Sequence, residues 1–259
     1  MPRLGLVAYS NVSPFRYGLR RMGVEFVDEV PAKLLPRLES GEVEAAILPV
    51  ADVLAHPELA ALPSTCIASD GTAMSVKLFS HIPPRFAESV ALDADSHTSA
   101  ALTQIVLDAY GAHPQYLTTP PDLEQMLSRA DAALLIGDPC LCAQPDKDLL
   151  VTDLGMAWKE LTGLPFVFAV WATREGTDYT ALDALIREAL EIGRNDLPTV
   201  AAEEAARLGL KPETMLIYLR DSLRYHLEDP YRAGLERFRQ MAVFRGLLGD
   251  AKPVRFALE

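Results

Sequence analysis

Four short polar turns hold the residues with which this chain of 259 amino acids could bind or transform a small molecule. The turns lie at residues 10–13, 69–75, 93–99 and 137–139, and each follows an apolar segment. Their hydroxyl, amide and carboxylate groups could hold a carboxylate or hydroxyl of a ligand, or accept a proton from it. The turns therefore predict a site for a small polar ligand, provided that the fold brings them together.

Asn11 stands at the tip of the first turn, in the sequence YSNVSPF. Ser13 directly precedes Pro14, so Ser13 is expected to cap the helix that starts there. This capping leaves the amide of Asn11 unused, and an amide offers two donors and one acceptor. Two interpretations stay open for Asn11: a side chain that binds a ligand in a cleft, or a mere part of the helix cap.

The third turn, in DADSHTSAAL, places small hydroxyl residues at the start of an amphipathic helix. The first N–H groups of a helix have no acceptor within it, and together with the helix dipole they attract an anion. Capping needs one hydroxyl and this turn has several, so Thr98 and Ser99 are predicted to bind a carboxylate or phosphate. His97 is the titratable group beside them, with either an acid–base role or an exposed position at the helix start.

The second and fourth turns add a hydroxyl and a carboxylate. In SDGTAMSVKLFS, Ser75 and Lys77 fall on one face of an expected strand, where the hydroxyl and N–H of Ser75 could meet a ligand. An ordinary bend with a solvated Lys77 is the alternative. In LLIGDPCL, Asp138 before Pro139 is expected to cap a helix. A carboxylate at a strand end in a cleft could also serve as general acid or base.

Charge and missing motifs limit the partners and the chemistry. The chain has 24 Lys and Arg against 36 Asp and Glu, a formal net charge of -12, which repels nucleic acid and anionic membranes at long range. The sequence contains no G-x-G-x-x-G, G-x-x-x-x-G-K-[ST], G-x-S-x-G or H-E-x-x-H motif. Dinucleotide, P-loop, hydrolase-elbow and zincin sites therefore lack support, and we expect no metal and no cofactor.

The first residues, MPRLGLVAYS, lack the regions of a signal peptide, and no apolar stretch is long enough to cross a bilayer. We therefore expect a cytoplasmic protein. The cysteines fit this expectation: Cys66, Cys140 and Cys142 are odd in number, and C-x-C is not a redox motif. They are predicted to be reduced and buried.

Short alternating strands and helices are expected to position the four turns. RLGLVAY, VEFVDEV and EAAILPV are predicted strands, with the helices PFRYGLRRM and AKLLPRLESG between them. This order implies a parallel sheet covered on both faces. A second set follows, with strand character in SVALDADS, PQYLTT and AALLIGD and a helix in HTSAALTQIVLDAYG.

After the apolar strand LPFVFAVWAT, the rest of the chain is expected to be helical, with Asp229 before Pro230 capping the last helix. Two core-facing stripes at helical spacing mark these helices: Leu182, Leu185, Ile186, Ala189 and Leu190, and then Tyr231, Leu235, Phe238 and Met241. We predict two lobes joined by two crossovers, residues 1–78 with 172–259 and residues 79–171. The ligand cleft would lie between them.

Five motifs carry a resemblance to a known family: YSNVSPF, SVKLFS, SHTSAAL, LLIGD and DLGMAWKELTGLPFVFAVWA. Together they resemble chorismate dehydratase, the first enzyme of the futalosine route to menaquinone, over nearly the whole chain. The last motif is the most specific. The resemblance implies the two-lobed α/β fold of type II periplasmic binding proteins, each lobe a mixed and mostly parallel sheet flanked by helices, in a cytoplasmic enzyme.

The resemblance also implies a reaction and a site. The enzyme would remove water from chorismate, a dianion, to give the aromatic 3-[(1-carboxyvinyl)oxy]benzoate, and this needs no metal, nucleotide or nucleophile. Asn11 would position the enolpyruvyl ether or the leaving hydroxyl. The expected substrate-binding residues are Tyr9, Asn11, Ser75, Val76, His97, Thr98, Ser99 and Gly137, and the expected catalytic residues are Asn11 and Asp138.

Two points of this site stay open. The base that takes the ring proton is Asp138, His97 or a carboxylate of the substrate itself. Members of the family often carry arginine directly before the Thr-Ser pair, where this chain has His97. The site for one substrate carboxylate therefore differs from that of these family members in the charge that faces the carboxylate.

Other functions stay open as well. The sibling 1,4-dihydroxy-6-naphthoate synthase shares the fold but usually carries a PNDTFxF type of first turn. A non-catalytic binding protein for a small carboxylate would need a signal peptide or lipid anchor, and a regulatory sensor would carry a DNA-binding module. Burial of the tail helices is compatible with a monomer or a homodimer.

Overall fold

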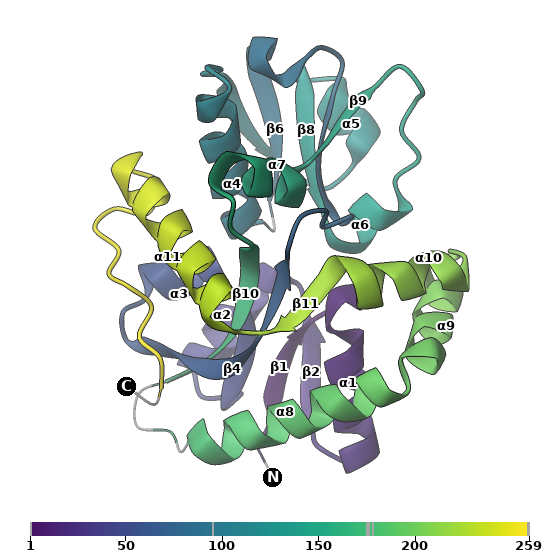
Figure 1. Ribbon diagram of the computed structural model, residues 1–259, viewed down its shortest axis with the longest axis vertical. Helices are drawn as coiled ribbons and strands as arrows, with labels where there is room; N and C mark the ends of the chain where they lie inside the picture. The colour runs from purple at the N-terminus through teal and green to yellow at the C-terminus, as the bar shows by residue number, and fades with distance from the viewer. Residues whose placement is uncertain (1, 95, 175–176, 178, 258–259) are drawn as a thin grey trace.

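The computed structural model describes residues 2–94, 96–174, 177 and 179–257, and the chain forms two α/β lobes (Figure 1). Each lobe is built on one sheet, and helices flank both sheets. The chain begins in the first lobe, crosses to the second and returns to the first. The first lobe therefore combines segments from both halves of the sequence.

The first lobe contains a six-stranded sheet in the order β11-β4-β10-β3-β1-β2. Its strands are β1 (Leu4–Val7), β2 (Phe26–Glu29), β3 (Ala45–Pro49), β4 (Leu59–Ser69), β10 (Phe166–Arg174) and β11 (Leu223–His226). The helical segments that accompany it are η1 (Ser10–Val12), α1 (Ser13–Met22), α2 (Pro31–Glu39), α3 (Val50–Ala55), α8 (Tyr179–Asn195), α9 (Leu197–Leu208), α10 (Pro212–Ile217), the π-helical turn η3 (Tyr218–Ser222) and α11 (Asp229–Phe244).

The second lobe contains a five-stranded sheet in the order β7-β6-β8-β5-β9. Its strands are β5 (Val76–Ser80), β6 (Ser89–Asp93), β7 (Gln115–Thr119), β8 (Ala132–Ile136) and β9 (Leu150–Asp153). Its helical segments are η2 (Pro84–Phe86), α4 (His97–Ala109), α5 (Leu123–Leu127), α6 (Gly137–Cys142) and α7 (Leu154–Thr162).

Both sheets are mixed, and their directions follow from the crossovers. The βαβ units give parallel pairs, β1 with β2 and β3, and β6 with β7 and β8. The strands that follow a crossover, β5 and β10, enter their sheets from the cleft and run antiparallel to both neighbours. Parallel pairing is therefore less dominant than the sequence pattern predicted.

Sheet membership also bears on the lobe boundaries. The expected divisions after residues 78 and 171 fall inside β5 and β10, because every residue of β5 pairs in the second sheet and those of β10 pair in the first. We therefore draw the first lobe as residues 2–69 with 166–257, and the second as 76–162.

Three details of the helix ends and the tail differ from the prediction. Ser13 is the first residue of α1 and not its cap, because the preceding η1 turn leads directly into the helix. Asp229 likewise begins α11, with Glu228 in the capping position. The tail includes a strand, β11, because the free edge of β4 offers it a partner. The two predicted stripes are confirmed: eight of their nine side chains are buried, and Leu185 packs partly buried against the core.

Asp131 ties β6 to β8 in the second lobe and gives it an acid-sensitive contact. Its Oδ2 accepts bonds from the N–H groups of Glu88 and Ser89 and from the Ser89 hydroxyl, which hold the pKa of Asp131 below its usual range. This contact stabilises the fold above the unfolded-state pKa of about 3.9 and is lost as the pH falls through the lower folded-state pKa.

We expect Asp131→Asn to be less stable than the wild type at pH 7 and the difference to shrink as the pH falls below about 4, because the unfolded parent then binds a proton that the folded parent binds only at a lower pH. Urea unfolding at pH 7, 5 and 3 measures this. Asp148→Asn, at an exposed position of the same lobe, is the control. A difference that is constant with pH would contradict the assignment.

Candidate active site between the two lobes

A cavity between the lobes is lined by residues of both. Its polar lining consists of Tyr9, Asn11, Ser75, Ser96, His97, Thr98 and Ser99, and its remaining lining of Val7, Pro31, Pro49, Ile67, Val76, Ile136, Gly137, Phe168, Ala169 and Leu223. Among the residues that the structure describes, no lysine or arginine lines it. The structure thus brings together all eight expected binding residues, and a ligand in this cavity would be held without a lysine or arginine from the described lining.

The start of α4 supplies hydroxyl groups that the helix does not consume. Ser96 occupies the capping position without a side-chain capping bond, and its buried Oγ has no hydrogen-bond partner among the described residues. Thr98 Oγ1 accepts a bond from the N–H of Ala51 at 3.0 Å, which leaves the Thr98 proton to donate. With Ser99 and the first N–H groups of α4, these hydroxyls form a set of donors for a carboxylate.

His97 connects the two lobes beside this helix start. Its Nδ1 lies 2.5 Å from Oδ1 of Asp52, a buried carboxylate of α3 in the first lobe. The sequence left two possibilities for His97, an acid–base role or an exposed position at the helix start. In the structure its side chain is half exposed and contacts a carboxylate of the other lobe. Asp52 carried no signal in the sequence, because it lies within a helix and meets His97 only through the lobe contact.

Asn11 presents an unsatisfied acceptor at the cavity. Its Oδ1 is buried, and no described residue donates to it. Because a buried amide oxygen without a donor costs free energy, a ligand hydroxyl or water that donates to it is favoured. Beside it the Tyr9 ring lies against Gly137, where a Cβ would stand 2.7 Å from the ring and where φ is +60°. Glycine is required there because a larger residue would push Tyr9 away.

Ser75 is oriented by a tyrosine from the tail. Tyr218, in the π-helical turn η3, donates its hydroxyl to Ser75 Oγ at 2.9 Å, and burial raises the pKa of Tyr218, which keeps it protonated. Since Ser75 Oγ accepts this bond, its own proton is directed elsewhere, and the cavity is open to it. The Ser75 N–H is not available as expected, because it donates to Ala73 O at 2.8 Å.

Asp153 explains why the motif that begins DLGMAW belongs to the site. Its carboxylate caps α7 through Gly155 and Met156, and it also accepts the N–H groups of Ala73 and Met74 in the crossover. Among the described residues other than glycine, Met74 alone has a left-handed backbone, φ 63°. These bonds hold the strained crossover that presents Ser75 to the cavity.

Asp138 is the expected catalytic residue that does not line the cavity. Its carboxylate is buried and accepts bonds from Ser10 N–H and from Arg207, so the helix-cap role expected for it is also not the one observed. The nearby Cys140 is buried, which raises the pKa of its thiol to about 12. Cys66 is buried as predicted and Cys142 only partly, all three without a disulfide.

The Tyr218 contact yields a prediction. Tyr218→Phe leaves Ser75 Oγ without its buried donor, so we expect a fall in melting temperature of about 2–8 °C and a weaker affinity for a carboxylate ligand. Differential scanning calorimetry and ligand titration measure both. Tyr110→Phe, which changes an exposed phenol, is the matched control. An unchanged ligand affinity in Tyr218→Phe would mean that this bond does not orient Ser75 for the ligand.

Two sheets, two crossovers and a donor-lined cavity between the lobes define a ligand-binding fold of the periplasmic binding protein type. Solved structures agree: a protein from Archaeoglobus fulgidus has a TM-score of 0.77 at 17% identity, covering 95% of this chain and 98% of its own. The periplasmic aliphatic sulphonate binding protein SsuA from Escherichia coli has a TM-score of 0.68 at 16% identity, covering 98% and 89%. These likenesses confirm the predicted fold.

The sequence relatives specify the family. A family model described as menaquinone biosynthesis matches residues 2–243. The chorismate dehydratase of Thermus thermophilus is 39% identical over 253 residues, which cover 91% of this chain and 93% of that protein. The chain therefore belongs to the menaquinone biosynthesis family. No helix among the described residues is long and apolar enough to cross a membrane.

Proposed function

We propose that this protein is a chorismate dehydratase, a hydro-lyase that converts chorismate to 3-[(1-carboxyvinyl)oxy]benzoate and water. The observation that carries the proposal is the interlobe cavity, in which hydroxyl groups at the start of α4 face Asn11 and Ser75. The 39% identity to the dehydratase of Thermus thermophilus supports it. A cytoplasmic location, as suits an enzyme of a biosynthetic family, is part of the proposal.

Two carboxylates of the substrate must be held without a cation in the described lining. In the proposal, Thr98, Ser99 and the N–H groups of α4 bind the ring carboxylate. The ring hydrogen to be removed is acidic through conjugation with that carboxylate, so negative charge grows on it as the proton leaves. Donors already aimed at this carboxylate stabilise the transition state more than the ground state.

The leaving hydroxyl and the ether occupy the other side of the cavity in this proposal. Asn11 Oδ1 accepts a hydrogen bond from the hydroxyl and its NH₂ group donates to the enolpyruvyl ether, while Ser75 donates to the second carboxylate. The base that takes the ring proton returns it to the hydroxyl as the C–O bond breaks, so the hydroxyl leaves as water. Tyr9 lies along the ring. The protein would then act mainly by holding the ring so that the hydroxyl and the neighbouring hydrogen are aligned for elimination, and aromatisation provides the driving force.

The base is proposed to be a group inside the cavity. Asp138 does not line it, which favours His97 or a carboxylate of the substrate. These two differ in the pH dependence of kcat, because a histidine base must be neutral to accept the proton, whereas a carboxylate base works at lower pH.

The test is to incubate the purified protein with chorismate and no added cofactor, and to follow the products by mass spectrometry and absorbance. The proposal expects a product that is lighter by one water and aromatic. Unchanged chorismate from a folded protein would refute it. The alternatives are then the sibling naphthoate synthase and a non-catalytic binding protein for a small carboxylate. A thermal-shift screen of small carboxylates identifies the ligand.

A further inference from the structure

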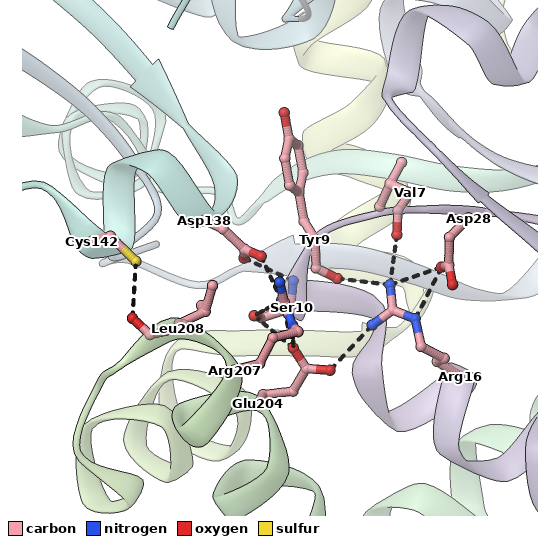
Figure 2. A network of polar contacts seen from close by, with 10 residues as sticks. All are labelled: Val7, Tyr9, Ser10, Arg16, Asp28, Asp138, Cys142, Glu204, Arg207 and Leu208. Atoms are coloured by element: carbon pink, nitrogen blue, oxygen red, sulfur yellow. Dashed lines mark hydrogen bonds and ion pairs between the residues drawn. The ribbon is translucent and has the colours of Figure 1, made fainter. Parts of the chain in front are cut away.

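The carboxylate of Asp138 joins the two lobes at one rim of the cavity (Figure 2). Asp138 belongs to α6 of the second lobe. Its Oδ1 accepts the N–H of Ser10 at 2.8 Å, and its Oδ2 accepts a bond from Nη2 of Arg207 at 2.6 Å, both in the first lobe. Only 7% of Asp138 is exposed, so this is a charge removed from water and satisfied by the opposite lobe.

The partners of Asp138 are also bonded to one another within the first lobe. Arg207 donates to Glu204 of the same helix, and Ser10 Oγ donates to Glu204 at 3.1 Å and accepts from Arg207 at 3.0 Å. Arg16 closes the cluster through Glu204 and the carbonyl oxygens of Val7 and Tyr9. Burial disfavours the Arg207 charge, but the bonds to Asp138 and Glu204 outweigh it and raise the pKa of Arg207.

Two consequences follow for the site. Ser10 directly precedes Asn11, so the bond from Ser10 N–H to Asp138 fixes the turn that carries the Asn11 amide. The cavity volume is about 70 Å³, whereas pockets for small organic ligands measure about 300–1,000 Å³. A cavity of this size does not admit a ring-sized ligand, so entry requires a separation of the lobes, which would withdraw Asp138 from Ser10 and Arg207.

We propose that Asp138 is a positioning residue: inserted between Ser10 and Arg207, it holds the lobes closed over the bound ligand. Arg207 is the cationic residue of the first lobe with which Asp138 forms an ion pair. The expected effect on KM and kcat rests on the proposed function, because it is measured with chorismate. The closure of the lobes by Asp138 does not depend on which ligand binds. Because Asp138 acts through Ser10, it changes the closed fraction and the affinity but not the proton transfer.

The test compares Asp138→Asn and Arg207→Met with the wild type. The Asp138→Asn variant keeps the size and the acceptor for Ser10 but loses the charge facing Arg207, and the Arg207→Met variant keeps an unbranched stem without the charge. Arg220→Met is the matched control, because Arg220 is an exposed arginine that pairs with Asp221 within the first lobe. Small-angle X-ray scattering of the ligand-free proteins reports lobe separation, and steady-state kinetics with chorismate reports KM and kcat.

We expect both variants to have a larger ligand-free radius of gyration than the wild type and the control, a KM about tenfold higher, and a kcat within about threefold of the wild type. Equal radii of gyration in all four proteins would overturn the proposal. A kcat lower by about 100-fold or more at unchanged KM would overturn it too, because that is the signature of a proton-transfer group. If the wild type leaves chorismate unchanged, the proposed function fails while the scattering comparison still decides the closure.

Discussion

Asn11→Ala should lower kcat for chorismate about 100-fold, the loss typical of removing one preorganised polar group from an active site. The reason is that the buried Oδ1 of Asn11 has no donor among the described residues and faces the cavity, where the proposal places the leaving hydroxyl. Alanine removes both the acceptor and the NH₂ donor. The kinetics are followed through the absorbance of the aromatic product, and the melting temperature should stay nearly unchanged because Asn11 lies in a short turn.

The chain offers a matched control, since it contains a second asparagine, Asn195, at the exposed end of α8. Asn195→Ala should turn over chorismate like the wild type. If Asn11→Ala did so as well, the interpretation of Asn11 as a structural part of the turn would stand and its proposed role would be rejected. A pronounced fall in melting temperature in Asn11→Ala would point to the same structural interpretation.

The parts of this site that could be predicted from the sequence are those in which a local signal and the site coincide. The start of α4 is an example, because hydroxyl residues before an amphipathic helix predict both the start of the helix and the free N–H groups there. Asn11 and Gly137 come after the apolar strands β1 and β8, and strands of a parallel unit end at one edge of a sheet, whereas Ser75 lies in the crossover directly before β5. The cavity is where these ends meet.

The parts that could not be predicted depend on contacts between distant segments. Tyr218 lies 143 residues from Ser75, in a π-helical turn that no periodicity signals. The sequence predicted Asp138 to be a helix cap or a general acid or base. Its actual partners, Ser10 and Arg207, belong to the other lobe and are brought to it only by the tertiary fold. The strand β11 has four residues, too few for a pattern, and forms because the β4 edge is free.

The strongest effect on affinity is expected from a single charge at the start of α4. Ser99 is 5% exposed, lines the cavity and stands in the first turn of α4. Ser99→Asp would place a carboxylate where the proposal puts that of the substrate. Two like charges about 4 Å apart repel by about 4 kcal/mol at an effective dielectric constant of about 20. We therefore expect KM for chorismate to rise on the order of 100- to 1,000-fold.

The charge of Ser99→Asp is also removed from water, because Ser99 is buried, and the favourable interaction with the helix dipole offsets only part of that cost. Ser99→Asn has the size of Ser99→Asp without the charge, so the comparison of these two variants separates repulsion from crowding. We expect Ser99→Asn to raise KM far less than Ser99→Asp, with calorimetry establishing that both variants are folded at the assay temperature. Equal KM values in the two variants would mean that no substrate carboxylate lies at α4, and the carboxylate site would then have to be sought elsewhere in the cavity.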